Sequence, residues 1–285
     1  DRKTKIVAAE GEIDIDDLIK EEQSVIALTH FGYVKRMPID TYRSQKRGGK
    51  GITGIATREE DFVKQIFTAS THDTILFFTN KGKLYKLRGY EVPEAGRTAR
   101  GTAIVNLLSL DAGEKVSAVI PIQNFAEGKY LLMSTKNGLI KKTALAEYNS
   151  ARKTGLQGIT LKEDDELIAV RLTDGEDNVI LVTRNGMCIT FDEKDVRPIG
   201  RVSQGVIGIR IDEDDEVIGM ESIIAGGKAT LLAITENGFG KRTELDEYRV
   251  QIRGGKGVIT YKVTPKTGKL VGARIATDDE DVMLI

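Results

Sequence analysis

Seven residues near the N-terminus combine positive charge and backbone freedom in a way that suits phosphate binding. They are Gln45, Lys46, Arg47, Gly48, Gly49, Lys50 and Gly51. Lysine and arginine supply charge and hydrogen-bond donors for phosphate oxygens, and glycine lets the backbone come close to a partner. The stretch contains no nucleophile, metal ligand or general base. We therefore expect it to bind a polyanion rather than to catalyse a reaction. The stretch returns at residues 251–257 with one position changed.

This return reflects a repeat of about fifty residues. In each repeat a short apolar strand ends in threonine, and a glycine follows three residues later, at Gly32, Gly82, Gly138, Gly186 and Gly238. Three of these turns end in Asn-Gly, the strongest short hairpin signal. The repeats begin near residues 23, 73, 129, 177 and 229, after a lead-in over residues 1–22, and a sixth begins near residue 281. We expect a single domain over residues 1–285.

The repeats predict an all-β fold. Each one holds about four short strands, and no long segment keeps a helical period with caps. A single unit of this size cannot bury its apolar face alone, so neighbouring units must pack on it. We therefore predict a propeller-like array of four-stranded blades, with five complete repeats and the start of a sixth.

Equivalent positions in the repeats share residue types. Ten residues after the turn glycine lie Tyr42, Val92, Tyr148, Val196 and Tyr248, and the exchange of tyrosine for valine predicts packing rather than nucleophilic attack. Nineteen residues after it lie Gly51, Gly101, Gly205 and Gly257, while the third repeat is taken as one residue longer and reaches Gly158. Fifteen residues after it lie cations, namely Arg47, Arg97, Lys153, Arg201 and Arg253.

These cations predict a positively charged rim. Cation pairs three and four residues after the turn glycines are assigned to the same rim, and so are single cations in or near the loops. The pairs are Lys35 with Arg36, Lys141 with Lys142, and Lys241 with Arg242; the single cations are Arg43, Arg100 and Lys256. The fourth repeat has Ile189 and Thr190 at the pair position, which predicts the weakest contact there. Five cations in phase on a radial array would point the same way and bind nucleic acid.

The composition agrees with a soluble, reduced protein. Forty-two basic and 43 acidic residues give a net charge of −1, yet residues 41–55 carry four cations and no acid. Acids gather at residues 163–166, 212–216 and 278–281, and local field matters more than total charge for docking a polyanion. Cys188 is the only cysteine, so no internal disulfide can form. Since apolar runs are short and no signal peptide is visible, we expect a cytoplasmic protein without membrane contact.

Other sites are disfavoured by their context. Residues 49–54 match the spacing G-x-G-x-x-G, but the following segment is strand-like, whereas a dinucleotide fold needs a helix. No glycine-lysine pair is followed by serine or threonine at P-loop spacing. The acidic turns lack the order of a calcium loop, which favours a solvated face opposite the basic one. His30 and His72 have no nearby cysteine cluster, so we do not expect a metal site.

The stretch at residues 45–51 resembles the seven-residue box of the DNA gyrase A C-terminal domain. That family usually has arginine where Lys46 stands, and the repeats resemble the domain along essentially the whole chain. The resemblance implies a β-pinwheel, a disk in which blades exchange strands, whose basic rim wraps duplex DNA with little sequence specificity. It implies that the rest of gyrase A, together with gyrase B, is the protein partner and that the domain is nucleoid-associated. It also implies no cofactor here, because the cleavage tyrosine, ATP and Mg²⁺ belong to other parts of the enzyme.

Three alternatives are compared with this interpretation. The C-terminal domain of the corresponding chain of topoisomerase IV typically has a degenerate box, whereas residues 45–51 are intact. A protein-binding β-propeller would have an apolar or mixed rim, which the phased cations disfavour. A propeller enzyme would need carboxylates or histidines clustered at a central channel, and none recur at a fixed repeat position.

Overall fold

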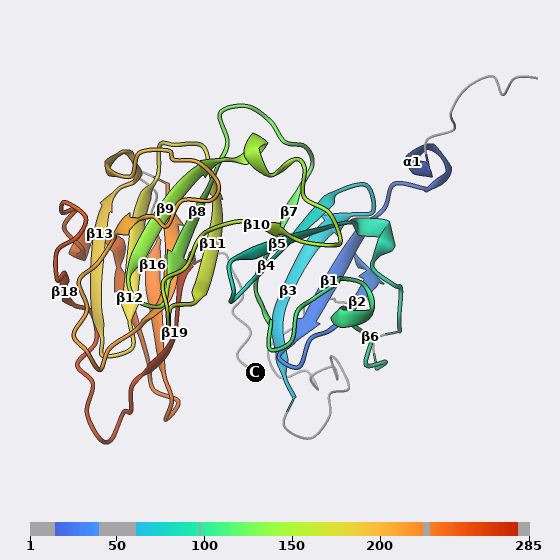
Figure 1. Cartoon of the computed structure of the whole chain (residues 1–285). Helices are drawn as coiled ribbons and strands as arrows, with labels where there is room; N and C mark the ends of the chain where they lie inside the picture. The colour runs from blue at the N-terminus through green and yellow to red at the C-terminus, as the bar shows by residue number, and fades with distance from the viewer. Residues whose placement is uncertain (1–14, 40–60, 97, 225–228, 279–285) are drawn as a thin grey trace, which may run out of the picture. The chain divides into compact units, whose positions relative to one another are not determined.

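A computed structural model describes residues 15–39, 61–96, 98–224 and 229–278 (Figure 1). The chain divides into two compact units, one of residues 1–73 with 88–102 and the other of residues 74–87 with 103–285. The box at residues 45–51, Arg43, Arg97 and the expected start of a sixth repeat all lie outside the described residues. Within the described residues, no helix has the length and apolar character needed to cross a membrane.

Strands are the main regular structure of the described residues, which confirms the all-β prediction. The first unit contains β1 (Gln23–Thr29), β2 (Tyr33–Pro38) and β3 (Val63–Ser70), and β6 (Thr102–Ala103) lies at its boundary. The second contains β4 (Thr74–Thr79), β5 (Lys83–Arg88), β7 (Val116–Ile122), β8 (Tyr130–Thr135), β9 (Leu139–Ala144), β10 (Leu156–Gln157), β11 (Leu167–Thr173), β12 (Asn178–Thr183), β13 (Met187–Asp192), β14 (Val206–Ile207), β15 (Val217–Ile223), β16 (Thr230–Thr235), β17 (Gly240–Glu244), β18 (Val258–Ile259) and β19 (Leu270–Ala276).

Helix is limited to short segments. The lead-in forms one turn of α-helix, α1 (Ile15–Leu18). Single 3₁₀ turns, which the sequence pattern did not predict, follow the hairpins or β6: η2 (Gly89–Glu91), η3 (Ile104–Asn106), η4 (Leu145–Tyr148), η5 (Glu193–Asp195) and η6 (Leu245–Glu247).

The threonine-to-glycine turns form hairpins, as predicted. In the third repeat, Gly138 adopts a φ of 86° and its N–H donates to the Thr135 carbonyl at 3.1 Å. The Thr135 hydroxyl then accepts from the Leu139 N–H at 3.2 Å. The other four repeats close their turns with the same pair of hydrogen bonds. The recurring threonine and glycine are therefore explained by local chemistry: glycine permits the left-handed backbone, and threonine supplies an acceptor.

Four of the five sheets in the described part of the chain take an edge strand from the next repeat. The strand orders are β3-β1-β2-β6, β10-β5-β4-β7, β11-β8-β9-β14 and β15-β12-β13-β18, whereas the fifth sheet has three strands within the described residues, β17-β16-β19. In the third sheet, for example, Val206 of β14 pairs with Ile140 of β9, although the two residues belong to different repeats. The four-stranded blades and the strand exchange implied by the resemblance are thereby confirmed.

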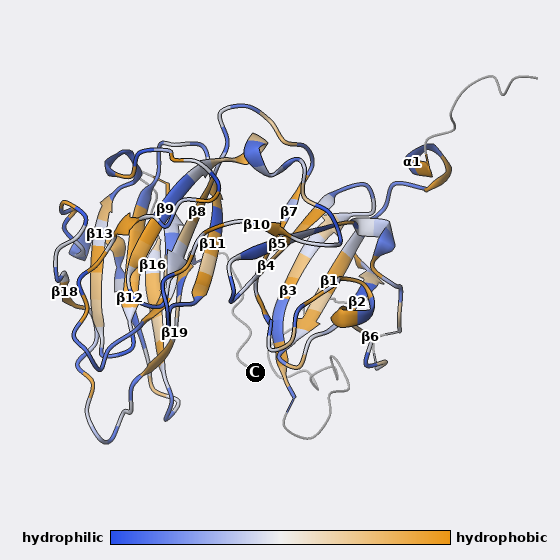
Figure 2. Ribbon diagram, viewed as in Figure 1, coloured by the Kyte–Doolittle hydropathy of each residue, from blue (hydrophilic) through white to orange (hydrophobic). Residues whose placement is uncertain are grey.

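The larger buried clusters lie between neighbouring sheets of the second unit, and a small one of Val25, Ala27 and Met37 lies in the first. One cluster joins Phe78 of β4 to Met133 of β8 and Tyr148 of η4, and similar clusters follow for the next sheets. The strands β7, β11, β15 and β19 pack against one another in succession. Arg171 of β11, Glu221 of β15 and Arg274 of β19 link three of them through ion pairs. Figure 2 shows hydrophobic strands and hydrophilic connecting loops, as this burial requires.

The third repeat has a shorter loop than its neighbours, which corrects the predicted alignment. Gly101, Gly155, Gly205 and Gly257 each precede the donated strand and have positive φ. An added Cβ at Gly205 would lie 2.7 Å from the Ile140 carbonyl oxygen of the preceding hairpin, so this position requires glycine. The equivalent residue in the third repeat is therefore Gly155, not Gly158. Its loop is two residues shorter than the others, rather than one longer.

Candidate nucleic-acid interface

The basic loops of the fourth and fifth repeats leave and rejoin the outer edge of the preceding repeat's sheet. Pro198 bridges to Lys142 of β9 in parallel, and Val206 then pairs with Ile140 in the antiparallel direction. Val250 makes the equivalent bridge to Thr190 of β13 before β18 begins. The segments 199–205 and 251–257 are thus loops that leave the sheet edge, and backbone pairing holds both of their ends.

These segments carry positive charge and contain no acids of their own. Starting from the buried tyrosine or valine of each repeat, residues 148–162 and 196–210 each contain three cations and no carboxylate. Residues 248–262 contain four cations and no carboxylate, in a chain whose net charge is −1. The positive potential is therefore local to the loops. The corresponding residues of the first repeat, 42–56, also carry four cations and no acid but lie outside the described residues.

Lys35 and Lys141 were expected on the rim, and the structure instead buries both. Lys35 is 1% exposed, and its ammonium donates to the carbonyls of Gly96 and Ala99 at 3.0 and 2.8 Å. Lys141 is fully buried and donates to the carbonyls of Gly158, at 2.7 Å, and Arg201. Burial lowers the pKa of Lys141 to about 8. Neither ammonium is open to a phosphate, so the rim interpretation is wrong for these lysines.

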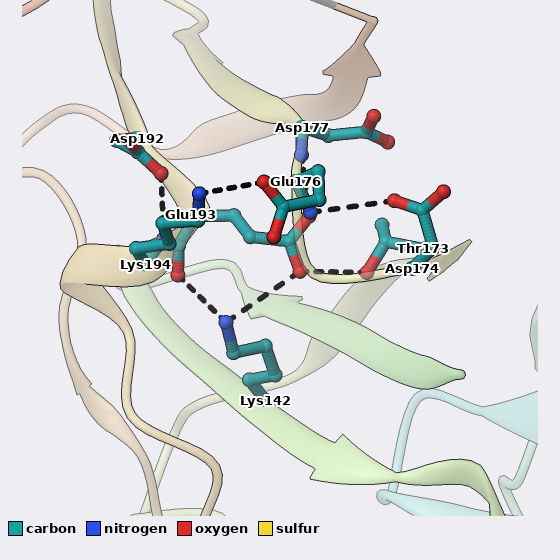
Figure 3. A network of polar contacts seen from close by, with 8 residues as sticks. All are labelled: Lys142, Thr173, Asp174, Glu176, Asp177, Asp192, Glu193 and Lys194. Carbon is teal, nitrogen blue, oxygen red and sulfur yellow. Dashed lines mark hydrogen bonds and ion pairs between the residues drawn. The ribbon is translucent and has the colours of Figure 1, made fainter. Parts of the chain in front are cut away.

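Lys142 is also buried, within the polar network of Figure 3. Its ammonium donates to the Glu193 backbone carbonyl at 2.9 Å and lies 3.6 Å from Glu193 Oε1. Glu193 is fully buried and accepts from the Thr173 hydroxyl at 2.7 Å and the Asp177 N–H at 3.1 Å. The physical reason for the error is the same for all three lysines: loops and turns of the next repeat cover the edge strand that carries them.

The remaining cation pairs are partly engaged. Arg36 is half-buried, donates from Nε to the Val92 carbonyl at 3.2 Å and pairs with Glu94. Lys241 is exposed, although its ammonium donates to the Thr260 carbonyl at 3.2 Å. Arg242 contacts the Thr230 hydroxyl and Asp278. The prediction that the fourth repeat is weakest rested on these pairs, and it loses its basis because Lys35, Lys141 and Lys142 are internal.

The loop cations differ in their surroundings. Arg201 donates from Nη1 to the Gln157 carbonyl at 2.5 Å, and Arg253 donates to the carbonyls of Asp195 and Ile207 at 2.9 and 3.0 Å. Lys153 is exposed but, because its loop is shorter, does not occupy the position of Arg201. Lys256 is exposed and lies 3.4 Å from Asp212. Arg100 is exposed and its guanidinium lies 5.4 Å from the Tyr33 ring centroid.

Several exposed cations in these segments were not among the predicted site residues. They are Arg152, Arg197, Arg210, Arg249 and Lys262. The sequence contained a usable signal for two of them: Arg197 and Arg249 follow the buried Val196 and Tyr248 directly, as Arg43 follows Tyr42 in the first repeat. Counting fifteen residues forward from each turn glycine does not reach Arg197 or Arg249, which lie eleven residues after Gly186 and Gly238.

The tyrosine and valine positions pack in the interior, as predicted. Val92, Tyr148, Val196 and Tyr248 are all buried, while Tyr42 lies outside the described residues. The Tyr148 hydroxyl donates to the Gly158 carbonyl at 3.1 Å, and burial raises its pKa above the ordinary value. A tyrosine so enclosed is a structural residue rather than a nucleophile.

Acids in two of the turns have a local structural role. Asp165 accepts from the N–H groups of Asn137 and Glu166 through one carboxylate oxygen, and Asp215 does the same for Asn185 and Glu216. These carboxylates therefore fix the hairpin turns. Within the described part of the chain, no group of three or more histidine, cysteine or acidic side chains is placed to hold a metal ion.

Four-stranded sheets that exchange their last strand with the next repeat define a β-pinwheel, a class of β-propeller. The sequence matches the family described as DNA gyrase C-terminal domain, beta-propeller, over residues 23–70, 73–123, 129–174, 177–224 and 229–277. The chain belongs to this family, and the resemblance inferred from residues 45–51 is confirmed.

Known relatives agree with this membership. The chain is 56% identical to the DNA gyrase A protein of Clostridium acetobutylicum over 285 residues, all of this chain and 34% of that protein. A solved DNA gyrase A C-terminal domain is 27% identical with a TM-score of 0.76, over 90% of this chain and 84% of that one. A topoisomerase IV C-terminal domain is 30% identical with a TM-score of 0.74, over 91% and 79% respectively. The chain thus spans about a third of the curated relative's length.

Proposed function

We propose that this chain is the DNA-wrapping domain of a gyrase A protein, which binds duplex DNA through its basic loops and bends it. The observation that carries the proposal is the charge of equivalent loops: residues 148–162, 196–210 and 248–262 hold three or four cations each and no acid. Their spacing along successive sheets suits a polyanion that passes from one repeat to the next. The family match and the gyrase A relative support the same function.

The energetics of bending favour many weak contacts over a few strong ones. Duplex DNA is stiff, and bending a short site smoothly costs about 1–6 kcal/mol. Phosphate contacts spread over several repeats offset this cost, and they respond to charge and shape rather than to base edges. Within the described residues no helix is long enough to enter a groove as a recognition element. We therefore expect little sequence specificity.

The chemistry belongs to the rest of the proposed enzyme. Because this chain spans about a third of the length of its relative, we place the cleavage tyrosine in another part of gyrase A and the ATP and Mg²⁺ sites elsewhere in the enzyme, with ATP bound by gyrase B. The wrapped DNA would present a second segment to that machinery with fixed handedness, and the domain needs no cofactor of its own. This role places the protein on the nucleoid.

The decisive experiment tests supercoiling by the parent enzyme with and without this domain, and with residues 45–51 replaced by neutral residues. We expect both changes to abolish negative supercoiling while relaxation and decatenation persist, because strand passage itself lies outside the domain. Neutralising Lys153 and Arg201 serves as the comparison and should lower DNA affinity only modestly. A box variant that supercoils plasmid at the normal rate would contradict the role given to residues 45–51.

A further inference from the structure

We propose that the loop arginines have divided roles: Arg201 and Arg253 position the loops, whereas Arg197 and Arg249 contact the phosphates of DNA. The inference rests on the proposed DNA-binding function. It deepens that function by assigning contact residues that differ from those selected by sequence phase.

The guanidinium groups of Arg201 and Arg253 donate hydrogen bonds to backbone carbonyls of the preceding repeat. Arg201 reaches the Gln157 carbonyl in the donated strand of the third repeat, and Arg253 reaches the Ile207 carbonyl in the donated strand of the fourth. Arg253 Nε also donates to the Asp195 carbonyl. An arginine at the same repeat position thus donates to the donated strand at two successive junctions between repeats. Such a repeated contact is typical of a residue that positions the loop.

The buried Lys141 also helps to hold Arg201 in place. Its ammonium donates to the Arg201 backbone carbonyl while also holding the Gly158 carbonyl. The Arg201 N–H in turn donates to Glu147 at 2.9 Å. Three polar contacts therefore fix the backbone and guanidinium of Arg201 against the third repeat, so the direction of its loop is set before any ligand binds.

Arg197 and Arg249 stand in a different environment. Each follows a buried residue, Val196 or Tyr248, and precedes the bridge to the neighbouring sheet edge, so its backbone is anchored on both sides. Both side chains are exposed, and neither makes a hydrogen bond or ion pair with another described residue. An exposed arginine keeps all its donors for a phosphate, and its anchored backbone loses little conformational entropy on binding.

A second pair of cations meets at the junction of the fourth and fifth repeats. The Arg210 N–H donates to the Gly255 carbonyl at 2.9 Å, which brings Arg210 beside Lys256. Both side chains are exposed, and the Lys256–Asp212 pair is three-quarters exposed on each side and therefore weak. Arg210 and Lys256 therefore add two exposed cations to the segments that also carry Arg197 and Arg249.

The test compares two double variants of the full chain by salt titration of binding to a linear DNA duplex. Each phosphate contact contributes about 0.9 to the slope of log K against log salt, so Arg197→Gln with Arg249→Gln should reduce the slope by about 1.8. Arg201→Gln with Arg253→Gln should leave the slope nearly unchanged. It should instead speed hydrogen exchange at the Ile199 and Gly208 amides, which are hydrogen-bonded at the ends of the loop.

The outcomes separate this inference from the proposed function. A wild-type slope near zero would reject DNA binding itself, and the inference with it. A steep wild-type slope that the Arg197 and Arg249 variant leaves unchanged would overturn the inference alone, as would an equal loss of slope in both variants. Circular dichroism checks that each variant keeps its sheets.

Discussion

The buried ion pair between Lys142 and Glu193 allows a sharp test of the packing between the third and fourth repeats. Replacing Lys142 with methionine keeps most of the side-chain volume but removes the ammonium. Glu193 then remains fully buried with the Thr173 hydroxyl and the Asp177 N–H as its donors. We expect the variant to lose stability because an uncompensated buried charge is far more costly than an exposed one.

The structure sets the magnitude. Breaking a buried pair typically costs about 3–5 kcal/mol, and the two remaining donors place this case near the lower end, at about 3 kcal/mol. This is a large part of the roughly 5–15 kcal/mol that stabilises a typical domain. Urea unfolding followed by circular dichroism measures the loss. Hydrogen exchange at the Ile199 amide, which donates to the Lys142 carbonyl at 2.9 Å, reports on the same junction locally.

A control lies in the same network (Figure 3). Lys194 and Glu176 are closer, at 2.6 Å, but both are largely exposed, so Lys194→Met should leave the free energy of unfolding almost unchanged. Glu193→Leu, introduced together with Lys142→Met, should recover most of the loss, since leucine stands at the equivalent positions 145 and 245. If Lys142→Met costs no more than Lys194→Met, then burial does not govern this pair and the reasoning is refuted.

Three further predictions concern other buried positions. Burial raises the pKa of Cys188 to about 12, so a thiol reagent at pH 8 should leave the native chain unmodified and react fully after denaturation in urea. Gly257→Ala should lower the free energy of unfolding by more than about 2 kcal/mol. The left-handed backbone alone costs about 1–2 kcal/mol, and the new Cβ would also clash with the Cys188 carbonyl. Gly272→Ala is the control, because an added Cβ there meets nothing within 4 Å. The pKa of Lys141 is about 8 in the folded state and 10.5 in the reference state. Between these pH values the unfolded chain binds more protons than the folded chain, so the free energy of unfolding should rise with pH. Urea titrations from pH 7.5 to 10.5 should show this rise, and Lys141→Met should abolish it.

The local features of the fold could be predicted from the sequence because each depends on neighbouring residues. The threonine and glycine of each turn, such as Thr135 and Gly138, make the same two hydrogen bonds in all five repeats. A pattern with a local cause recurs at fixed spacing, so the hairpins and the repeat length followed directly. The strand exchange followed from family resemblance, since spacing alone does not show which sheet receives the donated strand.

The candidate site was harder to predict because exposure is decided by distant segments. Lys142 looks like a surface cation on an edge strand until Glu193 of the next repeat covers it. Counting forward from Gly138 also placed Lys153 at the position of Arg201, because the two-residue shortening before Gly155 leaves no mark in composition. Arg197 and Arg249 were overlooked for a different reason: each directly follows the packed valine or tyrosine of its repeat, but cations were sought at other distances from the turn glycine.

The donated strand has a consequence for how such chains grow and shrink. The strands β10, β14 and β18 each complete the sheet of the repeat before them. The sequence repeat and the four-stranded sheet are therefore offset from each other by one strand. A tandem duplication of a whole repeat, for example residues 129–176, brings one receiving edge and one donated strand and preserves every pairing. A deletion that follows sheet boundaries instead leaves one edge without its strand. Copy number can therefore change in steps of a whole repeat while each junction keeps the same geometry.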